Sequence, residues 1–83
     1  MRGSEADQLD AISGAILAHL HTHPLAADSA SGVARWWLGP ELASVTPDQV
    51  ERALNALVAR RVMRCLALMD GTLLYSQAPL TRQ

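Results

Sequence analysis

The sequence contains only one cysteine, Cys65, among its 83 residues. A single thiol excludes an internal disulfide and a zinc site made of several cysteines, and it fits a reducing compartment. Long apolar runs are also missing, since none approaches the roughly 20 residues that cross a membrane. The first residues, MRGSEADQLD, lack the apolar segment of a secretory signal. These absences predict a cytoplasmic protein with no membrane partner.

Phenylalanine is absent, so leucine, isoleucine, valine, alanine and the two tryptophans must fill the core. Hydrophobic residues make up 49% of the chain, which is enough for a core. The length corresponds to one small domain, which buries about 60–65% of the surface that its unfolded chain exposes. Such a domain is often only marginally stable alone, and dimerisation is a common remedy.

Lysine is absent too: all seven cationic residues are arginine, and the net charge is −1. A nucleic-acid-binding domain is more often clearly basic, because contacts with phosphates provide most of its non-specific affinity. The charge therefore counts against a nucleic-acid partner, although a small basic face is compatible with an acidic remainder. We attribute the missing lysine first to genome composition and second to the better bidentate recognition that arginine provides.

Apolar spacing predicts two helices in the first half of the chain. The first should extend from Glu5 to Thr22, with Ser4 as its cap. Pro24 should end it, because the residue before a proline is pushed out of the α region. Its apolar stripe consists of Leu9, Ile12, Ile16 and Leu20. A shorter helix should follow over Ser29–Leu38, capped by Asp28 and stopped by the Gly-Pro pair after it.

The third helix has the strongest start signal in the sequence. Thr46 and Gln49 form a capping box, in which each side chain bonds the other residue's backbone N–H. Pro47 occupies the first helical position, where its missing N–H costs nothing. The predicted buried stripe consists of Val50, Ala53, Leu54, Leu57 and Val58. The segment between the second and third helices, residues 40–45, should form one irregular turn.

Asp70-Gly71 is a strong signal for a two-residue hairpin loop, because both turn positions favour positive φ. This loop would pair Met69 with Thr72 and Leu66 with Tyr75. Alternation along the strands then predicts one face made of Leu66, Leu68, Leu73 and Tyr75. The opposite face would consist of Cys65, Ala67, Met69, Thr72 and Leu74. We expect one domain over residues 5–78, with disordered ends at residues 1–4 and 79–83.

The segments GVARWWL and VTPDQVERALNALVARRVMR resemble the second helix, third helix and following strand of the small bacterial winged helix-turn-helix domain. The resemblance covers about residues 5–78. It implies a mainly α fold with a small β-hairpin, the wing, after three helices. Because such domains bind DNA, RNA or protein, the resemblance does not choose the partner. In two departures, Arg61 replaces the family's usual glycine, and the six residues of Pro40–Val45 form a long interhelical turn.

A DNA-binding regulator would read double-stranded DNA with the N-terminal part of the third helix. The candidate residues are Gln49, Arg52, Asn55 and Arg60 in the groove, and Arg64 on phosphate. Gln, Arg and Asn read bases bidentately, but Asp48 and Glu51 stand beside them and repel phosphate. The alternative is an ordinary solvated helix face with an Asp48–Arg52 pair and with cations favoured near the helix C-terminus.

A protein-interaction module would use the hairpin instead. It has no Lys or Arg from Cys65 to Ser76 and an aspartate at its tip, whereas a DNA-contacting wing normally carries a cation. An apolar outer face is costly unless a second copy or a partner protein covers it. The candidate interface residues are Trp36, Ala67, Met69 and Leu74. Alternatively, the first helix or the tail covers the hairpin, and Trp36 is partly buried against the segment after its helix.

The stretch HLHTH places His19 and His23 four residues apart, a spacing that can share a metal on a helix face. Pro24 should put His23 off the helix, however, which separates the two histidines. The sequence also has no glycine-rich loop of the kind that binds phosphate in enzymes. We therefore expect no metal, no cofactor and no catalytic site. By a narrow margin, the sequence favours a winged-helix DNA-binding regulator over a protein–protein interaction module, with self-association as a homodimer expected in either role.

Overall fold

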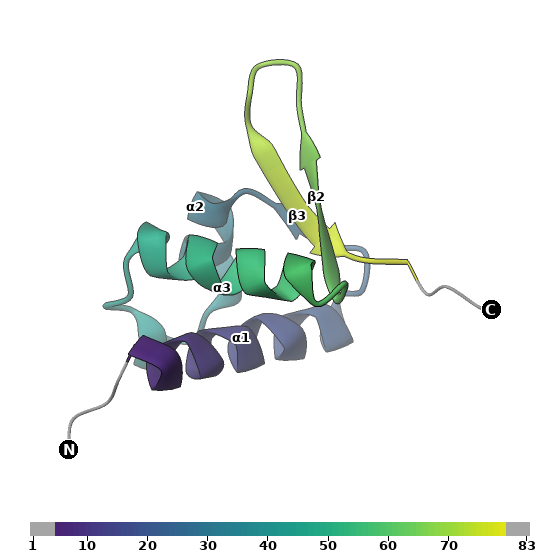
Figure 1. Ribbon diagram of the computed structural model, residues 1–83. Coiled ribbons are helices and arrows are strands. Elements are labelled where there is room, and N and C mark those ends of the chain that lie inside the picture. Colours follow the sequence, from purple (N-terminus) through teal and green to yellow (C-terminus); the bar gives the residue numbers. More distant parts are fainter. Residues whose placement is uncertain (1–4, 80–83) are drawn as a thin grey trace.

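The computed structural model describes residues 5–79, which form three helices and a small three-stranded antiparallel sheet (Figure 1). The strand order in the sheet is β1-β3-β2. The elements in chain order are α1 (Glu5–Thr22), β1 (Ala27–Asp28), α2 (Ala30–Gly32), η1 (Val33–Trp37), η2 (Pro40–Leu42), α3 (Pro47–Ala59), β2 (Met63–Ala67) and β3 (Leu73–Gln77). The predicted cap Ser4 and the predicted disordered ends lie outside the described residues, apart from Pro79, which has no regular secondary structure.

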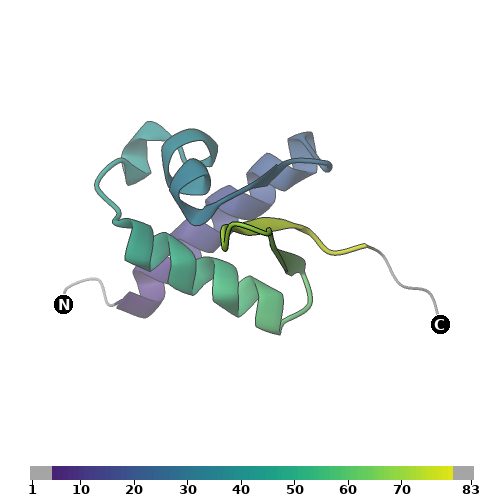
Figure 2. The same ribbon diagram turned by 90° about the horizontal axis from the view of Figure 1, so that it is seen from above.

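Helix α1 has the predicted bounds, and three residues of its predicted stripe, Ile12, Ile16 and Leu20, are buried. Its end is fixed as expected, because His23 and Pro24 follow it outside the helix. Figure 2 shows α1 crossing beneath α3, against which it packs. The core therefore begins between these two helices.

The second helical segment differs from the prediction at its start and along its length. Ser29 is the N-cap, and its Oγ accepts a hydrogen bond from Gly32 N–H at 3.2 Å. Asp28, the predicted cap, instead belongs to β1, and its carboxylate accepts from Ser29 N–H at 2.8 Å. A Cβ at position 32 would overlap this carboxylate, so a larger residue there would displace Asp28 from its bond with Ser29. After Gly32 the helix widens into the π-helical turn η1.

Helix α3 begins as predicted, with both halves of the capping box present. Gln49 N–H donates to Thr46 Oγ1 at 3.2 Å, and Thr46 N–H donates to Gln49 Oε1 at 2.9 Å. Four residues of the predicted stripe are buried, and they are Val50, Ala53, Leu54 and Leu57. The segment before the helix contains the short 3-10 helix η2, which is the irregular turn expected between the second and third helices.

Helix α3 ends in a glycine-type turn although it has no glycine there. Arg61 adopts φ 65°, in the left-handed region. Val62 N–H donates to Leu57 O, and Arg61 N–H donates to Val58 O, each at 2.9 Å, which is the bonding of a Schellman motif. Arg61 therefore adopts the conformation that glycine commonly takes at a helix end, at a conformational cost of about 1 kcal/mol.

The predicted hairpin register is wrong by one residue. The loop has three residues, Met69 to Gly71, with Gly71 at φ 92° and its N–H bonded to Leu68 O at 3.0 Å. Cα partners are Ala67↔Leu73, Leu66↔Leu74 and Cys65↔Tyr75. A shift of one residue in the pairing changes which side chains of β2 lie on the same face as those of β3. The predicted grouping of Leu66 with Tyr75 on one face is therefore wrong.

The sheet therefore has two faces that we define by their residues. The inner face consists of Met63, Cys65, Ala67, Leu73, Tyr75 and Gln77, and the outer face consists of Arg64, Leu66, Leu74 and Ser76. Tyr75 and Met63 are buried against the helices and complete the core. Strand β1, which the sequence did not predict, pairs Ala27 with Ser76 and adds the third strand.

Candidate functional site

The solvent-facing side of α3 is mixed in charge. Asp48, Arg52 and Asn55 are exposed and lie three or four residues apart, so they share one side of the helix. Glu51 is exposed beside them. This side of α3 therefore carries two carboxylates for one guanidinium, which gives it no excess of positive charge.

Gln49, a predicted DNA-reading residue, uses both ends of its amide within the fold. Its Oε1 accepts from the backbone of Thr46, and its Nε2 donates to Oε1 of Gln8 on α1 at 2.9 Å. The side chain is half-buried. It therefore fixes the start of α3 and ties it to α1, and a contact with a base would require both bonds to be released.

Asn55 lies on the predicted reading face but is joined to the sheet. Its Oδ1 accepts a hydrogen bond from the hydroxyl of Tyr75 at 3.5 Å. Burial raises the pKa of the Tyr75 hydroxyl, and the neighbouring Cys65 and Glu51 raise it further. The hydroxyl thus remains a neutral donor near neutral pH, and it connects β3 to the middle of α3.

The predicted basic residues Arg60 and Arg64 lie on different elements, away from the first turns of α3. Arg60 is the C-cap of α3, whereas Arg64 lies on the outer face of the sheet, where its Nε donates to Ser76 Oγ at 3.4 Å. Tyr75, which contacts Asn55, lies on the inner face. Arg64 is therefore separated from the reading face of α3 by the sheet itself.

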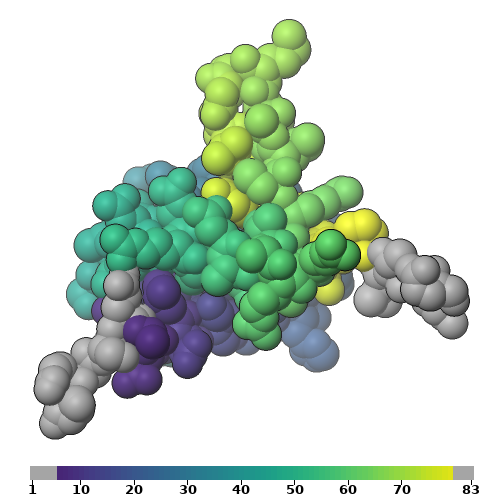
Figure 3. Space-filling model, viewed as in Figure 1, coloured from purple at the N-terminus to yellow at the C-terminus, as the bar shows by residue number. Residues whose placement is uncertain are grey.

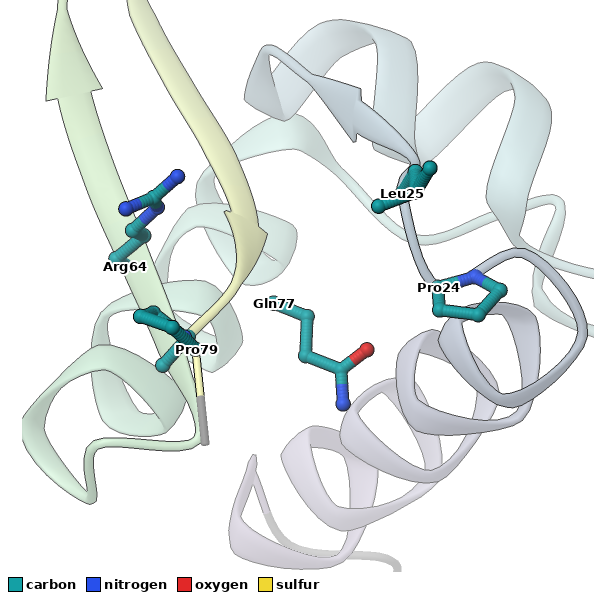
Figure 4. A pocket seen from close by; sticks show the side chains of 6 residues that line it. Pro24, Leu25, Arg64, Gln77 and Pro79 are labelled. Carbon is teal, nitrogen blue, oxygen red and sulfur yellow. The ribbon is translucent and has the colours of Figure 1, made fainter. Parts of the chain in front are cut away.

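Arg64 instead borders an open hollow at the base of the hairpin (Figure 4). The hollow has a volume of about 390 Å³, and Pro24, Leu25, Gln77, Ala78 and Pro79 complete its lining. A smaller hollow of about 260 Å³ lies between α2, α3 and β3, where Glu51 and Tyr75 form part of its wall. Residues of the hairpin therefore contribute to the walls of both hollows.

The hairpin formed by β2 and β3 stands out from the body of the molecule (Figures 1 and 3). Leu66 is 60% exposed and Met69, at the tip, is fully exposed. Leu68 and Leu73 are also exposed, and they extend the apolar surface to both faces. The tip carries Asp70, whose carboxylate accepts a hydrogen bond from Thr72 N–H, and this bond lowers the pKa of the carboxyl.

The predicted interface residues fall on different parts of this hairpin. Ala67 belongs to the inner face, Leu74 to the outer face and Met69 to the loop, so the prediction of one shared face is wrong. The apolar residues that the sequence missed as candidates are Leu66, Leu68 and Leu73. Their signal was present in the sequence, because a glycine after Met69-Asp70 also fits a three-residue loop with a left-handed last residue.

The two adjacent tryptophans differ in burial. Trp36 is 71% exposed, whereas Trp37 is buried and stacks on the ring of His19 at a centroid distance of 4.6 Å. The ring of His23 also lies close to that of His19, at a centroid distance of 4.8 Å. Burial and the charge of His23 lower the pKa of His19. This cluster closes the end of α1 over η1.

Within residues 5–79, no group of three or more His, Cys, Asp and Glu side chains is placed to hold a metal ion. No helix in that part of the chain is long and apolar enough to cross a membrane. Comparison with models of protein families, with characterised proteins and with solved structures gives no match. The geometry of the hairpin and of α3 is therefore the basis for inferring a function.

Proposed function

We propose that this chain is a winged-helix domain that binds another protein chain through its β2–β3 hairpin, the wing. The observation that carries the proposal is the exposure of Leu66, Leu68, Met69 and Leu73 on a hairpin that projects beyond the core. Several exposed apolar side chains on one projecting element of a small domain favour an interaction site, because leaving them in water is unfavourable. Methionine is enriched at protein interfaces, and the fully buried centre of an interface is more apolar than its rim.

The charges of the wing support the same proposal. From Cys65 to Ser76 the chain has no cation, and the carboxylate of Asp70 makes the tip negative. A wing that follows a DNA backbone needs positive groups, since neutralisation of phosphate supplies most of the affinity. A protein partner imposes no such requirement, so the composition of this wing fits protein better than DNA.

A photo-crosslinking residue in place of Met69 tests the proposal. Crosslinking in the intact cell should join the chain to a protein, while the same residue in place of Leu25, which is also exposed, should give little product. The additional substitution Leu66→Asp should remove the Met69 product, because it puts a charge into the apolar contact. Equal crosslinking from both positions, or none from Met69, would contradict docking through the wing.

DNA binding by α3 is the second candidate function, favoured by the order of the elements and by Arg52 on the exposed side of the capped helix. In that role α3 would enter the major groove, with Arg52 reading a guanine. Fluorescence anisotropy with a random duplex of about 30 base pairs tests it, because affinity from phosphate contacts falls steeply with salt. Salt-sensitive binding that Arg52→Ala weakens would favour DNA, and no binding at low salt would exclude it.

A further inference from the structure

We propose that the protein partner is a second copy of this chain, added along the open edge of β2 in antiparallel orientation. The inference rests on the proposed function, because it names the occupant of the same hairpin. In the three-stranded sheet β2 is an edge strand, and within residues 5–79 no strand pairs with its other side. An exposed edge presents unpaired backbone groups, which are a ready template for a further strand.

The hydrogen bonds of the hairpin show which residues face that edge. Leu68 N–H donates to Thr72 O, and Ala78 N–H donates to Val62 O, so the even-numbered residues of β2 direct their backbone groups toward β3. By alternation, Met63, Cys65 and Ala67 direct theirs away from β3. Met63 is buried, whereas Cys65 and Ala67 are exposed, so the part of β2 nearer the tip lies at the surface where a partner strand could pair with it.

Charge complementarity selects a second copy as the occupant. Asp70 is the charged group at the tip of the hairpin, and Arg60, Arg61 and Arg64 lie at its base. When two identical edge strands are related by a two-fold axis they are antiparallel, so the tip of each hairpin lies beside the base of the other. The same anion–cation contact is then made twice, while apolar residues occupy the middle.

The shape of the molecule favours a register centred on Ala67. This part of the hairpin stands clear of the helices, whereas a centre nearer the base brings the two bodies together (Figure 3). With Ala67 on the axis, Leu66 faces Leu68 of the second copy, and Arg64 comes within reach of its Asp70. The contact involves a short strand from each copy, so the interface is small and the dimer should dissociate on dilution.

Cysteine crosslinking tests the register in the intact chain with Cys65→Ser as the background. Ala67→Cys should form a disulfide-linked dimer under mild oxidation, because residues that meet at a two-fold axis between paired strands satisfy disulfide geometry. Thr72→Cys is the matched control: Thr72 is also exposed, but it lies between the loop and β3, on the side of the hairpin away from the open edge of β2. Equal crosslinking at both positions would contradict edge pairing.

Sedimentation velocity of the unmodified chain provides an independent measurement. We expect a monomer–dimer equilibrium whose dissociation constant rises roughly fivefold in Asp70→Asn, since each exposed ion pair contributes little and two are lost. Asparagine keeps an oxygen acceptor for Thr72 N–H, so the loop is preserved. A monomer at every concentration, with no Ala67→Cys crosslink, would overturn the second copy as partner. If Met69 still crosslinks to a different protein, docking through the wing stands; if it crosslinks to nothing, both proposals fail.

Discussion

The hydroxyl of Tyr75 on β3 donates a hydrogen bond to Oδ1 of Asn55 on α3 at 3.5 Å. Tyr75 is 1% exposed, and its ring is part of the core. The contact therefore couples the base of the hairpin to the exposed side of the helix. The orientation of the hairpin relative to α3 depends on this pair and on the packing beneath it.

Loss of this bond should lower the free energy of unfolding. We expect about 1 kcal/mol for Tyr75→Phe, which keeps the ring in the core, and a similar loss for Asn55→Ala. Urea denaturation followed by tryptophan fluorescence measures both, and the double variant should lose less than the sum. Additive losses would mean that the two side chains do not interact. A loss of duplex affinity in Asn55→Ala without a change of stability would instead indicate a base contact.

The left-handed residue at the end of α3 gives a second prediction. Arg61→Gly should raise the free energy of unfolding by about 1 kcal/mol, because glycine adopts positive φ without the steric cost of a Cβ. Arg60→Gly is the matched control, since Arg60 has φ −85° and gains nothing from glycine. Arg60→Gly should be neutral or destabilising by the same denaturation measurement. Equal effects of the two substitutions would show that charge, not backbone conformation, sets the difference.

The helix ends were predictable from sequence because their signals are local. Thr46 and Gln49 fix the start of α3 through two bonds that span only three residues, and Pro47 occupies its first position; the structure contains all of these features. Pro24 likewise places the end of α1. Short-range signals of this kind do not depend on the rest of the fold, so a sequence pattern is enough.

The hairpin register and the side-chain contacts between elements were not predictable in this way. Asp70-Gly71 fits a two-residue loop and the observed three-residue loop equally well, and the burial of Tyr75 against the helices distinguishes them. The bonds of Gln49 to Gln8 and of Asn55 to Tyr75 join residues 41 and 20 positions apart. No local pattern reports such pairs, so two candidate DNA-reading residues have structural contacts that the sequence did not reveal.

The stack of His19 on Trp37 predicts a pH dependence of stability. Burial, followed by the charge of His23, lowers the pKa of His19 below its ordinary value of 6.5. The unfolded chain therefore binds a proton at His19 more readily than the folded chain. The contribution of neutral His19 to the free energy of unfolding is thus fully present above pH 6.5 and is lost as the pH drops through the folded pKa. Measured between pH 8 and pH 5, His19→Gln should lose less stability on acidification than the wild type. His21→Gln is the control on the exposed side of α1, and it should follow the wild type.

Gly71 provides a direct test of the three-residue loop. Its φ of 92° is in the region that disfavours side chains, so Gly71→Ala should lower the free energy of unfolding by about 1 kcal/mol or more. Gly14→Ala is the matched control: Gly14 lies within α1, and a Cβ there has no atom within 4 Å. That substitution should raise the free energy of unfolding by about 0.5–1 kcal/mol, because alanine favours the helix.

Two-dimensional NMR of the wild type tests the register directly. It should show an Hα–Hα contact between Cys65 and Tyr75, a non-hydrogen-bonded pair. A contact between Leu66 and Tyr75 instead would restore the two-residue loop, and the apolar faces of the hairpin would be exchanged with it.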